Sequence, residues 1–311
     1  MTYLKLVRWK NLLIIILTQV MLKYFIINPL MNTYGVSNPL PGLVFWILCL
    51  STIFIAGAGY VINDIFDIQI DAVNKPSDKM IGKLISLEKA RRFYWLINGA
   101  GLLTGLIIGI LIDYINFVFI HLASAILLWY YSSYFKHKPL LGNILIAFLS
   151  AFSFYLLWMA ELIHGDYLYG PYSLPANVSA LVWGYTAFAF VMNILREIVK
   201  DIEDMDGDRA FGCRTLPLVF GANTARTAAV SVAMLIFVMT VVALVLMAKT
   251  GWFVLFGYFV LLIQLPLLWL TFRLVKARQK QHFHYVSGMI KLVMLTGVAS
   301  MAVVYYTMKM L

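Results

Sequence analysis

Nine apolar stretches, each long enough to cross a membrane as a helix, alternate with polar segments along the sequence. A helix needs about 20 mostly apolar residues to span the hydrocarbon core of a bilayer. Hydrophobic residues make up 62% of the 311-residue chain and charged residues 12%, which is too little polar surface for a protein that folds in water. The sequence therefore predicts an all-α, polytopic membrane protein and excludes a soluble enzyme or a secreted disulfide scaffold. The predicted bundle has nine transmembrane helices, at residues 9–28, 41–63, 92–112, 114–134, 140–163, 178–198, 224–248, 252–274 and 285–308.

The basic residues are distributed unevenly between the two ends of these predicted spans. Of the 24 lysines and arginines, 20 fall at the end that includes the N-terminus, three fall at the other end, and Lys291 lies inside the last span. Loops rich in lysine and arginine stay on the cytoplasmic side of a membrane. We therefore predict a multi-pass protein of the plasma membrane, with its N-terminus and a polar cavity facing the cytoplasm. This topology accounts for the net charge of +10, and we expect no nucleic-acid partner.

Ten of the 14 acidic residues lie in two short segments, each following an even-numbered span. In both segments three aspartates share the spacing Asp-x2-Asp-x3-Asp, and the two copies lie 137 residues apart. The duplication predicts a single domain over residues 1–311 built from a degenerate repeat, approximately 1–138 and 139–280, with a last helix over 285–308. The aspartates are Asp64, Asp67 and Asp71 in the first acidic segment and Asp201, Asp204 and Asp208 in the second.

The spacing of these aspartates indicates a metal site. On a continuous helix, which turns by about 100° per residue, each set of three falls within one narrow stripe. Carboxylates this close repel one another unless a cation holds them together, and Mg²⁺ prefers carboxylate oxygens and often bridges them to phosphates. The alternative is a solvated acidic loop beside the membrane, which the repeated spacing disfavours. We predict that all six aspartates bind Mg²⁺.

Basic residues interleave with both acidic segments. Each of them alone is explained by membrane topology, but together they suit a polyanionic ligand whose phosphate oxygens meet lysine or arginine. They are Lys75, Lys79 and Lys83 after the first segment, Lys200, Arg209 and Arg214 around the second, and Lys136 after the fourth span.

Two motifs in these segments resemble those of a known family. Asn63-Asp64-x2-Asp67-x3-Asp71-x2-Asn74-Lys75-Pro76 is similar to the first aspartate-rich motif of the UbiA superfamily of intramembrane prenyltransferases. Asp201-x2-Asp204-x3-Asp208-x3-Gly212-x2-Thr215 is similar to the second. Weaker landmarks are matched by Arg8, Asn11, Lys136 and the pair Gly142-Asn143. The chain departs from the family over residues 77–83, where an Arg-Pro pair and a Pro-x-Gly stretch are usual.

The resemblance implies an enzyme in which the six aspartates are catalytic, because they hold Mg²⁺ and, through it, the diphosphate of a polyprenyl donor. The donor would ionise toward an allylic cation, which a lipophilic acceptor attacks, while the isoprenoid tail lies among the helices beside membrane lipid. An aromatic face can stabilise such a cation. The substrate-binding residues implied by the resemblance are Asn63, Arg8, Asn11, Lys75, Lys79, Lys136, Lys200, Arg209 and, as an aromatic face, Tyr131.

The sequence is compatible with more than one kind of acceptor. The string Arg196-Glu197-x2-Lys200-Asp201-x-Glu203-Asp204 is most similar to the glycerolipid branch of the superfamily, the digeranylgeranylglyceryl phosphate synthases. That branch transfers a geranylgeranyl group to the hydroxyl of a prenylglycerol phosphate. Prenylation of an aromatic quinone precursor, of the 4-hydroxybenzoate or naphthoate type, is the alternative within the superfamily. A membrane ion transporter is the alternative from another class, although its acids are expected near the bilayer midplane. The oligomeric state is not specified by the sequence.

Overall fold

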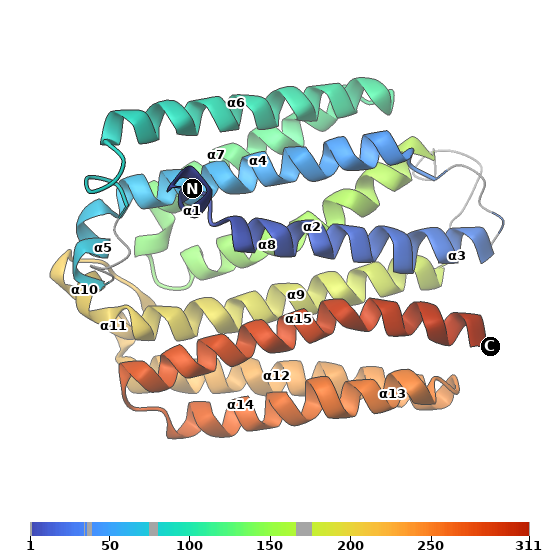
Figure 1. Ribbon diagram of the computed structural model, residues 1–311. Coiled ribbons are helices and arrows are strands. Elements are labelled where there is room, and N and C mark those ends of the chain that lie inside the picture. Colours follow the sequence, from blue (N-terminus) through green and yellow to red (C-terminus); the bar gives the residue numbers. More distant parts are fainter. Residues whose placement is uncertain (1, 34, 36–38, 75–79, 166–175, 311) are drawn as a thin grey trace.

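The protein is an elongated bundle of helices that run side by side (Figure 1). The computed structural model describes residues 2–33, 35, 39–74, 80–165 and 176–310, and these residues form helices and no strand. Eight helical spans are long and apolar enough to cross a membrane, and a ninth apolar helix, Phe117–Ser133, is shorter at 17 residues. The all-α, polytopic prediction is confirmed. The predicted number of nine is reached only when this shorter helix, expected over 114–134, is included.

The elements follow one another with short connections. The spanning segments are α2, η1 and α3 (Trp9–Met21, Leu22–Ile27, Asn28–Thr33), α4 (Gly42–Phe66), α6 (Leu87–Leu111), α7 (Phe117–Ser133), α8 (Leu141–His164), α9 (Ala176–Glu203), α12 (Ala222–Lys249), α13, η3 and α14 (Phe253–Phe259, Val260–Gln264, Leu265–Lys276) and α15 (Lys280–Met310). The short elements are α1 (Thr2–Leu6), α5 (Ile68–Asn74), η2 (Phe135–His137), α10 (Met205–Ala210) and α11 (Leu216–Phe220).

Two of the spans contain a π turn, and in each case a proline explains it. The π turn η1 comes just before Pro29, and η3 comes just before Pro266. Proline has no N–H to donate, and its ring collides with the carbonyl four residues earlier in a regular α-helix. A π turn widens the helix locally and lets the chain continue past the proline. Both spans therefore remain continuous.

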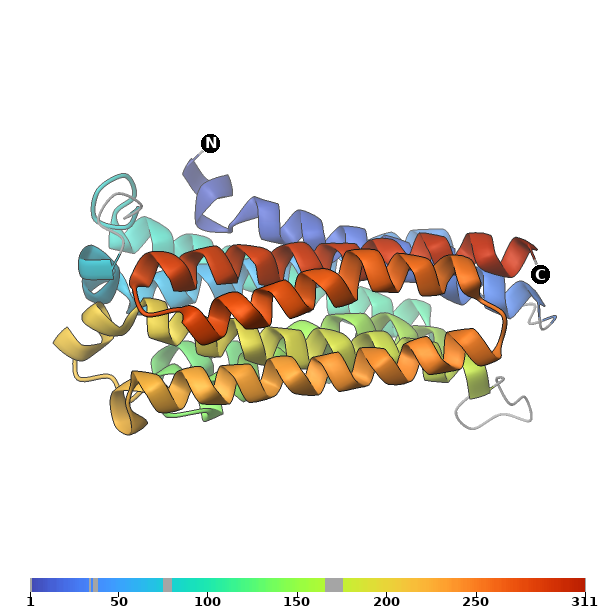
Figure 2. The same cartoon turned by 90° about the horizontal axis from the view of Figure 1, so that it is seen from below.

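The two acidic segments lie at the same end of the bundle. Helices α5, α10 and α11 gather at one end, and α3 and the C-terminus lie at the other (Figures 1 and 2). Helix α4 packs on α6 and α7, and α9 packs on α8, α12 and α15. Helix α15 also contacts α2 and η1, so it joins the last spans to the first.

Much of the outer surface is apolar, as expected for a protein surrounded by lipid. In α12 only 17% of the most apolar stretch is buried, and large side chains such as Leu235, Val238 and Val242 are exposed. An apolar surface this extensive marks contact with a membrane rather than with water. The chain is a multi-pass membrane protein.

A buried ion pair lies at the end of the bundle away from the acidic segments. Lys23 in η1 is 2% exposed, Glu161 in α8 is 0% exposed, and the two form an ion pair. Lys23 Nζ also donates to the carbonyl oxygen of Leu40 (2.9 Å), and the Leu40 N–H donates to Glu161 Oε2 (2.8 Å). This network ties the first span, the segment before α4, and α8 together.

Candidate active site

The helices that carry the two acidic segments break at corresponding aspartates. Helix α4 ends at Phe66 and α5 begins at Ile68, which leaves Asp67 between them at φ −92°, ψ 6°. Helix α9 ends at Glu203 and α10 begins at Met205, which leaves Asp204 at φ −95°, ψ 9°. The expectation of one regular helix through each segment is therefore wrong. Aspartate favours such a break because its short side chain competes for backbone hydrogen bonds.

The breaks place the third aspartate of each segment on a separate short helix. Asp71 lies on α5 and Asp208 on α10, and these two helices pack against each other. Segments 137 residues apart in the sequence thus meet at one end of the bundle.

In the first acidic segment, Asp64 is held by the residue that precedes the first span. Arg8 Nη2 lies 2.7 Å from Asp64 Oδ1, and the Arg8 guanidinium lies 5.0 Å from the centre of the Tyr60 ring. Arg8 has φ 53° and ψ 53°, a left-handed conformation that is unfavourable for a residue with a Cβ. Asp71 is also within electrostatic reach of Arg8.

Asp67 is held by Lys136, from the connection between α7 and α8. Lys136 Nζ forms an ion pair with Asp67 Oδ1, and Asn63 Nδ2 donates to Asp67 Oδ2 at 2.8 Å. Lys136 Nζ also lies 3.4 Å from Asn63 Oδ1. Lys136 reaches this position because Gly142 lets its backbone pack closely on α8. A Cβ at Gly142 would lie 2.7 Å from Lys136 Cα.

In the second acidic segment, Asp201 is held by a neutral side chain. Asn143 Nδ2, at the start of α8, donates to Asp201 Oδ2 at 2.8 Å. One helical turn earlier, the buried Glu197 accepts from Arg196 Nη1 at 2.7 Å, and Lys200 Nζ lies 3.9 Å from Glu197 Oε2. Asn143 belongs to the Gly142-Asn143 landmark, but its contact with Asp201 could not be derived from the sequence.

Carboxylates from both segments interact electrostatically. Burial, and then the charges of Asp204 and Asp67, raise the pKa of Asp208 to about 6, while Lys200 and Lys136 act in the opposite direction. Tyr131 near the end of α7 lies within electrostatic reach of Asp67, Asp201 and Arg8. Tyr131, which the resemblance implies as an aromatic face, therefore lies near residues of both acidic segments.

The structure does not bring together all of the predicted site residues. Lys75 and Lys79 lie outside the described residues. Arg209 is exposed on α10 and forms no ion pair with any residue that the structure describes. In the described part of the chain, no hydrogen bond joins the side chain of Asn11 to any of the six aspartates. Its backbone N–H donates to the Arg8 carbonyl oxygen at 2.8 Å.

Two residues that the sequence did not single out connect the halves of the site. Cys213 Sγ lies 3.0 Å from His137 Nδ1, and the Arg214 N–H donates to the His137 carbonyl oxygen at 3.1 Å. These contacts join the loop after α10 to the loop that carries Lys136. Cys213 and His137 lie 76 residues apart in the sequence, and no spacing pattern links them. Their contact could therefore not be predicted.

The donor set suits a hard divalent cation, but its ligands are not yet gathered. Among the described residues, no three acidic, histidine or cysteine side chains are grouped closely enough to hold a metal ion. Arg8, Lys136 and Asn143 occupy oxygens of Asp64, Asp67 and Asp201 instead. Carboxylate oxygens, which both segments supply, are the ligands that Mg²⁺ prefers. The residues therefore fit Mg²⁺ after these contacts exchange.

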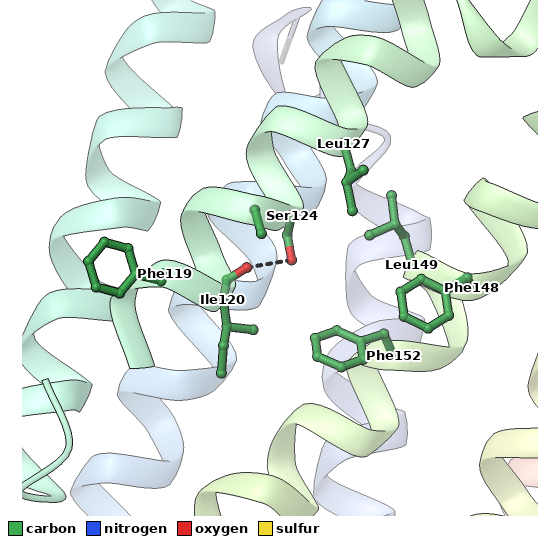
Figure 3. Close-up of a pocket in the computed structure, with 8 residues that line it drawn as sticks. Phe119, Ile120, Ser124, Leu127, Phe148, Leu149 and Phe152 are labelled. Carbon is green, nitrogen blue, oxygen red and sulfur yellow. Dashed lines mark hydrogen bonds between the residues drawn. The ribbon is translucent and has the colours of Figure 1, made fainter. Parts of the chain in front are cut away.

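An apolar pocket lies between α7 and α8 (Figure 3). Its volume is about 340 Å³. The Ser124 hydroxyl donates to the Ile120 carbonyl oxygen at 2.9 Å, so the lining offers almost no free polar group. Phe119 and Phe148, at its edge, are largely exposed, so the pocket opens toward lipid. The lining residues are Phe119, Ile120, Ala123, Ser124, Leu127, Phe148, Leu149 and Phe152.

We expect Gly142→Ala to disturb the loop that carries Lys136. The added methyl group would lie 2.7 Å from Lys136 Cα and 2.8 Å from the Phe135 carbonyl oxygen, and overpacking of this kind costs roughly 1–3 kcal/mol. The measurement is the melting temperature in detergent, which should fall. Gly184→Ala is the matched control, because nothing lies within 4 Å of that Cβ. Equal melting temperatures for the two variants would contradict the close approach.

Sequence comparison identifies relatives over most of the chain. The model of the UbiA prenyltransferase family matches residues 26–307. The digeranylgeranylglyceryl phosphate synthase of Thermococcus sibiricus is 30% identical over 220 residues, which are 70% of this chain and 69% of that protein. The synthase of Methanobrevibacter smithii is 33% identical over 182 residues, which are 58% of this chain. The chain spans 60% of the length of that relative.

Solved structures share the fold over nearly the whole chain. A structure of a digeranylgeranylglyceryl phosphate synthase superposes with a TM-score of 0.61 at 23% identity, covering 97% of this chain and 98% of that one. A UbiA homologue from Archaeoglobus fulgidus, solved with GPP and Mg²⁺, gives a TM-score of 0.60 at 17% identity and covers 97% and 100%. At these identities the likeness establishes a common fold.

Proposed function

The chain belongs to the UbiA prenyltransferase family, and on that premise we propose that it transfers a geranylgeranyl group from its diphosphate to the hydroxyl of a prenylglycerol phosphate. The observation that carries this proposal is the meeting of the two acidic segments at one end of a membrane bundle, beside Arg8 and Lys136. The choice of acceptor is supported by the names of the relatives from Thermococcus and Methanobrevibacter.

In this proposal the six aspartates hold Mg²⁺, and basic side chains bind the diphosphate. Bound Mg²⁺ would neutralise the charge that develops on the leaving diphosphate. The support for Mg²⁺ is the carboxylate donor set and the presence of Mg²⁺ with GPP in the Archaeoglobus homologue. Asn63 orients Asp67, and Tyr131 presents its ring to the allylic cation. The proposed ligands of the diphosphate are Arg8, Asn11, Lys75, Lys79, Lys136, Lys200 and Arg209.

The reaction makes an ether bond. The bond between C1 of the prenyl group and the diphosphate oxygen breaks, and its electron pair leaves with the diphosphate. The acceptor hydroxyl oxygen bonds to C1 and releases its proton. Arg8 and Lys136 stabilise the departing charge because they lie in a partly buried site, where electrostatic interactions are stronger than in water.

The apolar pocket between α7 and α8 suits the isoprenoid tail of the donor. Leu127, which lines it, precedes Tyr131 by four residues, about one helical turn. A diphosphate bound at the aspartates would therefore direct its chain past Tyr131 toward the pocket and the lipid. We further propose that the aspartates face the cytoplasm of a cell whose plasma membrane contains the protein, because lysine and arginine are concentrated at that end.

We expect Ala123→Trp to discriminate between donors by chain length. The indole fills the pocket, so kcat/KM for geranylgeranyl diphosphate should fall roughly tenfold or more, since each methylene left unburied costs about 0.8 kcal/mol. Dimethylallyl diphosphate should be affected much less, because its five-carbon chain does not reach the pocket. Val242→Trp on the lipid-facing side of α12 is the control. An equal loss with both donors would place the tail elsewhere.

The proposal is tested with purified protein, geranylgeranyl diphosphate and a panel of acceptors, with products identified by mass spectrometry. We expect an ether product with geranylgeranylglycerol phosphate that EDTA abolishes and added Mg²⁺ restores. A prenylated aromatic acid instead would support the quinone-precursor alternative within the same family. Product formation that does not depend on a divalent cation would contradict the proposed site.

A further inference from the structure

We infer that Arg196 and Lys291 bind the phosphate of the acceptor, and that this pair makes the enzyme select an acceptor with a phosphate next to its hydroxyl. Neither residue binds the donor or Mg²⁺ in the proposed function. The inference rests on that function, because it names the subsite for the second substrate of the same reaction.

Lys291 is a charged residue inside a membrane span. It is exposed on α15, eleven residues after the helix begins, and lies within the span predicted over 285–308. A charged side chain at such a position is costly and marks a functional site by default. Among the described residues Lys291 forms no ion pair with a carboxylate. Glu203, which is within its electrostatic reach, is hydrogen-bonded to His284.

Contacts at two levels fix how α15 packs on α9. The two helices run antiparallel and side by side (Figure 1). Near the end that carries the acidic segments, His284 Nδ1 lies 2.8 Å from Glu203 Oε1. Farther along the bundle, the Tyr185 hydroxyl lies 2.8 Å from Ser300 Oγ. These two contacts determine which residues of the two helices face one another.

The packing places Lys291 opposite Arg196. Lys291 follows His284 by seven residues, and Arg196 precedes Glu203 by seven residues. Seven residues make about two helical turns and return to nearly the same face. Lys291 is accordingly within electrostatic reach of Arg196, and also of Arg8 at the active site. Two cations from different helices therefore lie at one level of the bundle, beside the donor site.

This level is the one at which the acceptor has to approach the donor. Arg196 precedes Asp201 by five residues, so it lies about 7.5 Å farther into the membrane along α9. The adjacent Glu197 is within electrostatic reach of Tyr131, which presents its ring to the allylic cation in the proposed function. C1 of the prenyl group lies on the membrane side of the diphosphate. A phosphate held by the pair would therefore lie beside C1.

A phosphate monoester matches the donors that the pair offers. The guanidinium of Arg196 supplies two parallel N–H groups, and the ammonium of Lys291 supplies a point charge. Glu197 orients the guanidinium, because it accepts from Arg196 Nη1 at 2.7 Å. In a prenylglycerol phosphate the phosphate and the free hydroxyl are on neighbouring carbons. Binding of the phosphate therefore orients the hydroxyl toward C1, which favours the reaction.

The experiment compares two acceptors, geranylgeranylglycerol phosphate and geranylgeranylglycerol, in steady-state kinetics of the full-length protein with geranylgeranyl diphosphate. We expect the unmodified protein to prefer the phosphorylated acceptor roughly 100-fold in kcat/KM, because two charged groups bind the phosphate. Lys291→Met should lower this preference roughly tenfold, through a higher KM for the phosphorylated acceptor. The kcat/KM for geranylgeranylglycerol and the KM for the donor should stay unchanged. Lys291→Arg should keep most of the preference.

Two further variants make the result specific. Lys280→Met is the matched control, because it removes the same charge from an exposed position at the start of α15, and it should keep the full preference. Arg196→Gln should lower the preference in the same direction as Lys291→Met, so the inference is tested even if one variant fails to fold.

The outcomes separate this inference from the proposed function. Equal use of the two acceptors by the unmodified protein would overturn the phosphate subsite alone. A higher KM for the donor in Lys291→Met, with the KM for the acceptor unchanged, would also overturn it and assign the pair to the diphosphate. Failure of the unmodified protein to prenylate either acceptor would overturn the proposed function as well.

Discussion

Asp67→Ala and Asp204→Ala are each expected to lower the rate of prenyl transfer roughly 100- to 1,000-fold. These aspartates lie at the two corresponding helix breaks, so each loss removes a carboxylate from the junction where the acidic segments meet. The departing diphosphate then loses electrostatic stabilisation in a partly buried site, and a single group of this kind contributes on the order of 10²–10³ in rate. The measurement is kcat with geranylgeranyl diphosphate in detergent or nanodiscs.

Asp206→Ala is the matched control for the second segment. Asp206 is exposed on α10, two residues from both Asp204 and Asp208, so its removal changes the local charge equally without removing a proposed ligand. We expect at most a few-fold change in kcat. Equal losses for Asp204→Ala and Asp206→Ala would mean that only the overall negative charge of the segment matters. All variants should keep the melting temperature of the unmodified protein within a few degrees.

Lys23→Ala is expected to cause the largest loss of stability of any single substitution considered. It leaves Glu161, which is 0% exposed, without its cation. Removal of one member of a buried ion pair costs roughly 3–5 kcal/mol because the remaining charge is uncompensated. The measurement is thermal unfolding in detergent, monitored as the fraction of protein that stays monodisperse after heating.

The exposed pair of Arg92 and Glu88 provides the control. Its side chains are 78% and 72% exposed, and exposed pairs of this kind contribute about 0–1 kcal/mol, so Arg92→Ala should be nearly neutral. The double variant Lys23→Met with Glu161→Met should recover part of the loss, since no charge is left buried. Recovery should be incomplete, because the Leu40 N–H and carbonyl lose their partners. A double variant less stable than Lys23→Ala would contradict this account.

The membrane spans could be predicted from the sequence because hydrophobic length is a local property. Each predicted span has a helix in the structure, although α4 and α9 continue beyond the predicted ends, to Phe66 and Glu203. Lys23, which lies in the predicted first span and was counted among the three basic residues at the end away from the N-terminus, is buried in that span. Its partner Glu161 is 138 residues away, and no local pattern reveals a pairing over that distance.

The sequence predicts which residues are candidates for the site, but it does not predict how their side chains are arranged. The repeated aspartate spacing identified which residues lie at one end of the bundle. It could not reveal the breaks at Asp67 and Asp204, because intrinsic helix propensity is a weak determinant that tertiary contacts override. The contact of Asn143 with Asp201 depends on how α8 packs on α9, and the contact of His137 with Cys213 depends on how the loop after α10 meets η2. The metal-binding and substrate-binding roles of the individual residues stay predictions until the variants are measured.

The position of α15 has a consequence for how the protein is made. This helix packs on α9 and α14 but also on α2 and η1, which leave the ribosome some 250 residues before it. Helices α4, α6 and α7 can pair as soon as they are inserted, whereas the first span has to wait in the bilayer with one flank unmatched. In a nascent chain that stops before α15, the surface of α2 and η1 that α15 covers would be exposed to lipid. Quality-control proteases of the membrane would have an unpaired helix to recognise.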